Sequence, residues 1–417
     1  MSTYTIQGGV PLTGSVNVHG AKNAALKLMA ASILTEDTCV IRNVPDIKDV
    51  RTMIDVLNCL GAEADYRPDG VITIMADGGL KDRAPYELVS QMRASIIVLG
   101  PLLARLGRAH VALPGGCNIG SRQIDMHLAG LKRMGVKITT EHGYIEGVDG
   151  RLRGARIPLD FPSVGATENV LMAAALAKGT TVIENAAREP EIIELVDFLL
   201  AMGAEIRGAG SSEIVIEGVE KLRGVEHTVL PDRIEAGTLL LAGAITGGEI
   251  TIAGAVAADL RLVLDKLVET GATISESPAG ITIKGPKRPR SIDIATLPFP
   301  GFPTDLQPLM AAYLAKAKGT SVLTENVFEN RFMYIDELNR MGADIKLDGH
   351  HAVIRGVPGL SGAPVRVPDL RAGAALIIAG LAAEGETIVY DSGHIERGYE
   401  NLDEKLKDLG AHITRVE

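Results

Sequence analysis

A short motif ending in glycine recurs six times along the chain, and this repetition limits the possible folds more than any other feature. In each copy an apolar run with helical spacing leads to the glycine, and a short stretch of alternating apolar and polar residues follows, as in "LNCLGAEAD" and "LKRMGVKIT". Glycine directly after a helix is typical of the left-handed position that ends helices, and alternation is typical of a strand. The six glycines lie 68 to 74 residues apart and are Gly61, Gly135, Gly203, Gly271, Gly342 and Gly410. Repeats of this length predict one structural unit copied six times.

A second recurring piece precedes each of these helices. It is an alanine-rich apolar run, such as "NAALKLMAASIL", "NVLMAAALA" or, in the second copy, "ASIIVLGPLLARLG", followed by a strand of the type "GTTVIEN". Because a helix that is apolar nearly all round is a buried helix, we expect an α/β fold with these helices inside and the sheets outside. Six units divide into two domains of three, and the polar segment 225–237 is the expected crossing between them.

One copy departs from the repeat, at the stretch "PGGCNIGSR". From the turn before the second strand to the helix-ending glycine, five copies span 23 to 25 residues and the second copy spans 28. Because five units pack without this insertion, we interpret it as a functional loop. It places Cys117 among glycines and five residues before Arg122, and a nearby guanidinium favours the nucleophilic thiolate. Cys39 and Cys59, in an expected strand and an expected helix, are predicted to be structural.

Polar residues interrupt the apolar pattern at equivalent places in several units. At the starts of the first helices and in the loops before the second helices stand Lys22, Asn23, Arg93, Ser163, Asp305, Arg371, Arg122, Arg331 and Arg397. Cations at helix N-termini form anion sites, because the N–H groups and the dipole there already attract negative charge. Taken singly, an arginine at such a place is more often a solvated surface residue, and Asp305 is more often a helix cap. Their recurrence in two pseudo-symmetric halves favours a cleft for a ligand with several negative charges.

Composition excludes some classes of partner and compartment. The net charge of −10 argues against broad binding to nucleic acid or to membrane surfaces, because there is no excess positive field. Three cysteines without CxxC spacing indicate a reducing compartment and neither a disulfide framework nor a zinc site. The sequence shows no signal peptide and no apolar run long enough to span a bilayer. We therefore expect a cytoplasmic protein.

Several motifs taken together resemble one known family over essentially the whole chain. "GAKNAAL", "MRAS", "LPGGCNIGSR", "SVGAT", "FPTDLQ", "ENRF", "PDLRAGAALI" and "IERGYE" resemble the UDP-N-acetylglucosamine 1-carboxyvinyltransferases of the enolpyruvyl transferase family. The cysteine loop and "PDLRAGAALI" together are highly specific, whereas "SVGAT" is only supportive. The resemblance implies an inside-out α/β barrel with two domains, each of three βαβαββ units. Residues 1–20 with 231–417 would form the domain carrying Asp305, Arg371 and Arg397, and residues 21–230 the domain carrying the Cys117 loop.

The resemblance also implies a reaction. The enolpyruvyl group of phosphoenolpyruvate would pass to the 3′-hydroxyl of UDP-N-acetylglucosamine through a tetrahedral intermediate, with release of phosphate. This is the first committed step of peptidoglycan synthesis, on which the cell wall, cell shape and cell division depend. Cys117 would protonate C3, form a covalent adduct at C2 and be the point of attack of fosfomycin, and Asp305 would take the hydroxyl proton. Lys22, Arg122 and Arg397 would bind phosphoenolpyruvate, and no cofactor or metal is implied.

Further substrate contacts follow from the same resemblance. Asn23 would orient the substrates and the intermediate, and Arg331 and Arg371 would stabilise the closed site or product contacts. The positions that match nucleotide-binding residues of the family are Arg93, Arg122, Gln123, Ile124, Asp125, Met126, Ser163, Val164, Gly165 and Val327. The chain departs from some members at Phe161, where they have a lysine, so the amides of Ser163 and Gly165 would carry more of the diphosphate contact.

Three alternatives differ in chemistry or class. The 3-phosphoshikimate enolpyruvyl transferases share the six-unit plan, but they lack the glycine-flanked cysteine loop and their acceptor has no uridine. A non-catalytic paralogue that binds a UDP-sugar need not keep Lys22, Cys117, Asp305 and Arg397 together, as this chain does. RNA-phosphate cyclases use related repeats, but they need a nucleotidyl-accepting residue and a basic RNA surface, which the charge of −10 disfavours.

Overall fold

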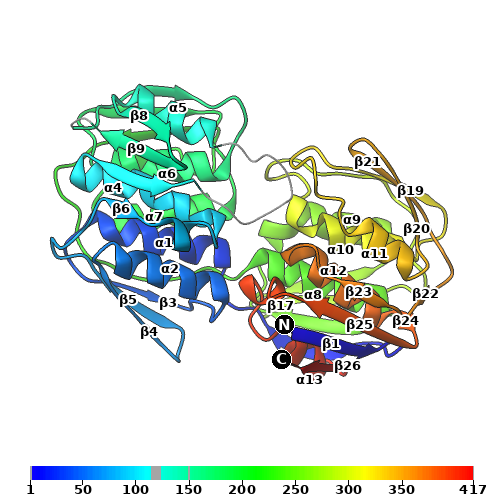
Figure 1. Ribbon diagram of the computed structural model, residues 1–417. Helices are drawn as coiled ribbons and strands as arrows, with labels where there is room; N and C mark the ends of the chain where they lie inside the picture. Colours follow the sequence, from blue (N-terminus) through cyan, green and yellow to red (C-terminus); the bar gives the residue numbers. More distant parts are fainter. Residues whose placement is uncertain (1, 114–123, 149–150, 417) are drawn as a thin grey trace. The chain divides into compact units, whose positions relative to one another are not determined.

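Alanine-rich helices lie at the centre of the fold, and four-stranded sheets cover them. The structure is a computed structural model that describes residues 2–113, 124–148 and 151–416 (Figure 1). Nearly every side chain of the central helices is buried, and in α12 all of them are. These helices are α1 (Lys22–Ala31), α4 (Leu99–Leu106), α6 (Val164–Ala175), α8 (Arg233–Thr246), α10 (Gln307–Leu314) and α12 (Leu370–Leu381). The prediction of buried helices inside and sheets outside is confirmed.

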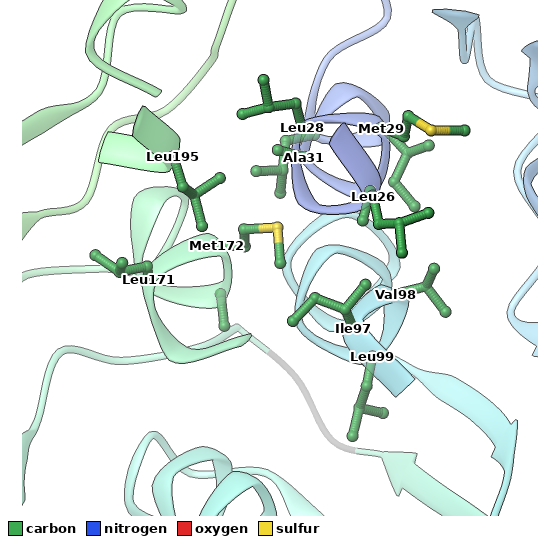
Figure 2. Close-up of a cluster of buried hydrophobic side chains, with 14 of the residues drawn as sticks. Leu26, Leu28, Met29, Ala31, Ile97, Val98, Leu99, Leu171, Met172 and Leu195 are labelled. Atoms are coloured by element: carbon green, nitrogen blue, oxygen red, sulfur yellow. The ribbon is translucent and has the colours of Figure 1, made fainter. Parts of the chain in front are cut away.

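The chain forms two compact units, each with its own hydrophobic core. One unit gathers residues 2–19 with 231–416 and is called here the Asp305 unit; the described residues within 20–230 form the other, the Lys22 unit. Figure 2 shows part of the core of the Lys22 unit, a buried cluster that includes Leu28 and Met29 of α1, Ile97 and Met172. Removal of this apolar surface from water is the main stabilising contribution in each unit.

Three four-stranded sheets enclose the helices of the Lys22 unit. Each contains one parallel pair followed by two antiparallel pairings. Their strand orders are β14-β3-β5-β4, β6-β7-β9-β8 and β10-β11-β13-β12. The strands are β3 (Cys39–Arg42), β4 (Glu63–Arg67), β5 (Val71–Met75), β6 (Arg83–Ala84), β7 (Ala109–Ala112), β8 (Lys137–Glu141), β9 (Tyr144–Val148), β10 (Arg156–Pro158), β11 (Thr180–Glu184), β12 (Glu205–Arg207), β13 (Glu213–Glu217) and β14 (Glu226–Thr228).

The Asp305 unit repeats this arrangement with strands from both ends of the chain. Its sheets have the orders β16-β17-β15-β2, β18-β19-β21-β20 and β23-β25-β1-β26, and β22-β24 forms a separate pair. In the last sheet β1 is antiparallel to both neighbours, with Tyr4 opposite Val389 and Arg415. The strands are β1 (Ser2–Gln7), β2 (Thr13–Asn17), β15 (Glu249–Ala253), β16 (Thr273–Ser277), β17 (Gly280–Lys284), β18 (Ile294–Ala295), β19 (Thr320–Thr324), β20 (Asp344–Asp348), β21 (His351–Arg355), β22 (Leu360–Ser361), β23 (Pro364–Arg366), β24 (Ala383–Glu384), β25 (Glu386–Asp391) and β26 (His412–Val416).

The second helix of each repeat ends as the sequence predicts. These helices are α2 (Lys48–Cys59), α5 (Asp125–Arg133), α7 (Pro190–Ala201), α9 (Arg261–Glu269), α11 (Ile335–Arg340) and α13 (Leu402–Asp408). All six glycines that follow them have positive φ, from 88° at Gly342 to 102° at Gly203. Each of the six repeats therefore has the predicted order, and each unit is an inside-out α/β barrel of three βαβαββ repeats. Among the described residues, no helix is both long and apolar enough to cross a membrane.

The central helix of the second copy differs from the single helix that the sequence predicts. The run divides into the 3-10 helix η2 (Arg93–Val98) and α4. Asn169 of α6 causes the break, because its Oδ1 accepts the Gly100 N–H at 2.7 Å and its Nδ2 donates to the Ile96 carbonyl at 3.1 Å. Those two backbone groups would otherwise bond to each other within an α-helix. Elsewhere the predicted positions of Cys39, buried in β3, and Cys59, at the end of α2, are confirmed, and both thiols are free.

Candidate active site

The carboxylate of Asp305 is held by two arginines from other segments of the same unit. Asp305 lies in the 3-10 turn η4 (Thr304–Leu306), directly before α10. Its Oδ1 accepts a hydrogen bond from Arg331 Nη2 at 2.9 Å, and its Oδ2 accepts one from Arg371 Nη2 at 3.2 Å. The side chain of Asp305 remains 26% exposed, whereas those of Arg331 and Arg371 are only 2% and 4% exposed. An interpretation of Asp305 as a simple helix cap is therefore wrong, because its oxygens bind guanidinium groups.

Arg371 is fixed by its position in the first turn of α12. Asp369 caps this helix, and its Oδ1 accepts the backbone N–H groups of Arg371 and Ala372 at 2.8 and 3.1 Å. The guanidinium lies over the ring of Tyr399, 5.1 Å from its centroid. Burial alone would lower the pKa of Arg371, but Tyr399, Asp305 and Asp232 together raise it above its ordinary value. Arg371 is consequently a permanent cation beside Asp305.

The same two arginines keep buried donors that the described residues do not satisfy. Nε of Arg331 and Nη1 of Arg371 have no hydrogen-bond acceptor in the parts of the chain that the structure describes. A buried donor without an acceptor is costly, so these groups are suited to an anionic ligand. Arg397, the last residue of the 3-10 turn η5 (Ile395–Arg397), is half-buried in the loop before α13, as predicted. It stands two residues before Tyr399, the aromatic partner of Arg371.

In the Lys22 unit, the predicted lysine is a buried cation at a helix start. Lys22 and Asn23 are the first two residues of α1. Lys22 Nζ lies 2.6 Å from Asp49 Oδ2, and the two side chains are 9% and 4% exposed. Asp49, in the first turn of α2, orients the ammonium group, which has three N–H donors in all. The start of α1 has no side-chain cap among the described residues, so its N-terminal amides add to the local attraction for anions.

The predicted nucleotide contacts of this unit come together at the starts of α5 and α6. Asp125 and Met126 open α5 after Ile124, while Val164 and Gly165 open α6. Ser163 caps α6, its Oγ accepting the Ala166 N–H at 3.3 Å. The His127 ring of α5 packs so closely on Gly165 that a Cβ there would lie 3.0 Å from its Cε1.

Asn169 links these helix starts to the segment that carries Arg93. Its Nδ2 lies 2.9 Å from His127 Nδ1 of α5 and also donates to Ile96 in η2, which begins at Arg93. Three predicted contact segments therefore meet at one buried amide. Because Nδ2 is a donor, His127 Nδ1 acts as the acceptor in this pair.

Some predicted and some unpredicted residues need separate mention. Cys117, Arg122 and Gln123 lie outside the described residues. Val327, in the loop after β19, donates its N–H to Glu325 Oε1 at 2.8 Å. The partners that hold the predicted side chains were not predicted from the sequence; they are Asp49, Asp369, Tyr399, His127, Asn169 and Glu325. The useful signal was a polar residue at the start of a helix or inside an alanine-rich one, as in "TENVLMAA" and "PDLRAGAA".

Comparison with known proteins adds sequence relatives of similar length. Residues 6–406 match the family EPSP synthase (3-phosphoshikimate 1-carboxyvinyltransferase). A protein of Symbiobacterium thermophilum named UDP-N-acetylglucosamine 1-carboxyvinyltransferase 1 is 55% identical, over 99% of this chain and 95% of its own. A protein of the same name from Caldanaerobacter subterraneus subsp. tengcongensis is 52% identical, over 99% of both chains.

Solved structures share the whole fold. The crystal structure of the enolpyruvyl transferase NikO from Streptomyces tendae superposes with a TM-score of 0.90 at 28% identity, covering 100% of this chain and 99% of that one. EPSP synthase from Acinetobacter baumannii superposes with a TM-score of 0.77 at 21% identity over the full length of both chains, a similarity of fold alone.

Proposed function

This chain belongs to the enolpyruvyl transferase family, as a member of the UDP-N-acetylglucosamine 1-carboxyvinyltransferases, and from that premise we propose how its residues divide the reaction. The enzyme transfers the enolpyruvyl group of phosphoenolpyruvate to the 3′-hydroxyl of UDP-N-acetylglucosamine and releases phosphate. This transfer is the first committed step of peptidoglycan synthesis.

The bonds that change define the groups required. In the addition step C3 of phosphoenolpyruvate gains a proton, the sugar oxygen bonds to C2 and the hydroxyl loses its proton, giving a tetrahedral intermediate. In the elimination step C3 loses a proton and the C2–O bond to phosphate breaks. The site therefore needs an acid near C3, a base near the hydroxyl, and cations for the carboxylate and the phosphate.

Asp305 is the base in this proposal, and the single observation that carries it is the arrangement of Asp305, Arg331 and Arg371. Ion pairs to both oxygens fix the orientation of the carboxylate. Partial exposure of Asp305 between two buried arginines makes it the accessible member of the group. A fixed, accessible acceptor satisfies the first geometric requirement for general base catalysis.

Lys22 and Arg397 are the proposed cations for phosphoenolpyruvate, with Arg122. Lys22 stands at a helix start whose amides add to its attraction for an anion. Cys117 is the proposed acid at C3, and as a thiolate it would add to C2 or open the epoxide of fosfomycin. Such a thiol has to remain reduced, and for this reason we place the protein in the cytoplasm.

The remaining residues are assigned to the UDP-sugar. The starts of η2, α5 and α6 supply Arg93, Ile124–Met126 and Ser163–Gly165, and the shared contacts of Asn169 support their acting together. Gln123 and Val327 complete this set. Phe161 is 37% exposed and offers no charge, so the amide groups at the start of α6 would meet the diphosphate instead.

The decisive assay is release of phosphate from phosphoenolpyruvate. We expect release with UDP-N-acetylglucosamine and none with shikimate 3-phosphate, because a UDP-sugar site offers no specific contacts to the smaller acceptor. Asp305→Asn should reduce the rate by about a hundredfold or more while UDP-sugar binding persists. Binding of UDP-N-acetylglucosamine without any phosphate release would identify a non-catalytic paralogue and overturn the proposal.

A further inference from the structure

One buried carboxylate joins the two segments that position Asp305 and Val327. Glu325 follows β19 and is only 3% exposed. Its Oε1 accepts hydrogen bonds from Thr296 Oγ1 at 2.8 Å, Val327 N at 2.8 Å and Phe328 N at 3.1 Å. Its Oε2 accepts one from Thr304 Oγ1 at 2.9 Å. The reaction described above gives this side chain no role.

The donors to Glu325 come from the loop directly after it and from positions 21 and 29 residues before it. Thr304 directly precedes Asp305 in η4, while Val327 and Phe328 begin the loop that leads to Arg331. Arg331 in turn donates to Asp305 at 2.9 Å. The turn that carries Asp305 and the loop that begins at Val327 are thus connected twice. Glu325 makes one connection, and the pair of Arg331 and Asp305 makes the other.

A carboxylate suits this position because it only accepts hydrogen bonds, and the groups that face it are donors. Three of them converge on Oε1 and one binds Oε2. Thr296 reinforces the arrangement, because its Oγ1 also accepts the Asn326 N–H at 2.9 Å. A buried carboxylate is retained where both of its oxygens accept hydrogen bonds, as they do here.

We propose that Glu325 is a positioning residue for enolpyruvyl transfer. It fixes the turn Thr304–Leu306, called here the Asp305 turn, relative to the loop 327–331, called here the Val327 loop. The inference rests on the function proposed above, since it needs Asp305 as the base and Val327 as a UDP-sugar contact. Glu325 itself touches neither substrate. Its effect passes through Thr304 to the base and through two backbone amides to the loop.

This arrangement predicts a specific kinetic pattern. Without the carboxylate the turn and the loop are connected only through the pair of Arg331 and Asp305, so both the rate of transfer and UDP-sugar binding should suffer. Phosphoenolpyruvate binding should change little, because Lys22 and Arg397 stand on other segments. A variant that only lowered the fraction of folded enzyme would reduce kcat and leave both KM values unchanged.

The test compares Glu325→Ala and Glu325→Gln, with Thr324→Val as the matched control on the neighbouring residue. In Glu325→Ala we expect kcat to fall about a hundredfold, as for misplacement of a catalytic group, and KM for UDP-N-acetylglucosamine to rise about tenfold. Glu325→Gln should recover most of the activity, because its amide oxygen can accept the Val327 and Phe328 N–H groups while its nitrogen donates to Thr304. Thr324 meets this cluster only through its backbone carbonyl, which accepts the Thr296 N–H at 2.9 Å. Its hydroxyl instead meets His351 at 2.9 Å, so the valine variant should behave as wild type.

A second variant covers the case in which Glu325→Ala does not fold. Thr304→Val removes only the bond to Oε2, so kcat should fall while KM for UDP-N-acetylglucosamine stays constant. Wild-type kinetics in both variants, or loss of kcat in Glu325→Ala without any change in either KM, would overturn the inference. Asp305→Asn, assayed in parallel, distinguishes failure of the proposed function from failure of the role given to Glu325. Full activity in Asp305→Asn refutes Asp305 as the base. An inactive Asp305→Asn together with wild-type kinetics in Glu325→Ala refutes only the role of Glu325.

Discussion

A buried ion pair in the Lys22 unit joins two central helices, α1 and α6, that are otherwise largely apolar. Lys27 of α1 and Glu168 of α6 are 10% and 0% exposed, and Lys27 Nζ lies 3.2 Å from Glu168 Oε2. Burial raises the pKa of Glu168 to about 7; Lys27 opposes this shift, and Glu191 and Glu189 add to it. Lys27 Nζ also donates to the carbonyl of Asn23 at 3.3 Å. Lys27 therefore lies one helical turn after Lys22 and Asn23, the residues of α1 that are proposed to bind substrate.

The raised pKa of Glu168 makes stability depend on pH. Its contribution is complete below the ordinary pKa of about 4.5 and is lost as the pH rises through about 7. Lys27→Met removes the cation that lowers this pKa, so the destabilisation should grow from pH 5 to pH 8, by up to about 1.4 kcal/mol for each further unit of pKa increase. Urea unfolding at the two pH values measures this. Adding Glu168→Gln should abolish the growth, and an equal loss at both pH values in the single variant would contradict the explanation.

The two roles proposed for Cys117 make different chemical demands. Protonation of C3 needs an acid, which a carboxylic acid can also supply, whereas opening of the fosfomycin epoxide needs a thiolate. We expect Cys117→Asp to retain substantial turnover with its optimum at lower pH and to resist fosfomycin. Cys117→Ser should be nearly inactive, because a hydroxyl is too weak an acid. Rates across pH with and without fosfomycin test this, and a fosfomycin-sensitive Asp variant would show that alkylation occurs elsewhere.

At the scale of residues, the sequence identifies side chains better than their partners. Asp305, Arg331 and Arg371 could be selected because they break an apolar pattern at equivalent positions, and the structure brings these three together. Asp49 and Glu325 could not be selected, because an acidic residue near the start of a helix or the end of a strand is ordinary in any sequence. Only the fold shows that they contact Lys22 and the Asp305 turn.

Among the elements, the helix-ending glycines permit a direct test. Gly410 has φ of +93° and a Cβ there would meet nothing within 4 Å, so Gly410→Ala should cost only backbone strain, about 1–2 kcal/mol. Gly359 in the same unit has equally open surroundings without a positive φ. Gly359→Ala should therefore be neutral or slightly stabilising. Thermal unfolding of both variants measures the difference, and similar effects would contradict the conformational explanation.

Elements were predictable from the sequence where one local rule decides them. The positive φ of the six glycines follows from the helix-ending pattern, and the burial of the central helices follows from their lack of a polar face. The division of the second central helix was not predictable. It depends on Asn169, which lies 69 residues after Gly100 and takes its N–H group. A long-range side-chain contact of this kind leaves no trace in local periodicity.

For the whole molecule, the two chain ends meet in one sheet, with Thr3 opposite Val416. A short flexible linker can therefore join them. We expect a circular permutant opened between Pro278 and Ala279, exposed residues of the β16–β17 turn, to fold and keep phosphate-release activity. The same permutant opened inside β25, between Ile388 and Val389, should not fold, because β25 pairs on both sides with β23 and β1. Soluble yield and activity distinguish the two, and equal behaviour would contradict this account of the sheet.

The place of β1 also has a consequence for synthesis on the ribosome. β1 emerges from the ribosome long before its two partners, β25 and β26. At ~5–20 residues per second, about 20 to 80 s pass between the emergence of β1 and that of β26. During this interval the Lys22 unit can complete its own core, whereas Tyr4 and Ile6 still lack the sheet that buries them. Synthesis thus imposes an order of assembly: the Lys22 unit can fold first, and β1 can be buried only after β25 and β26 have been made.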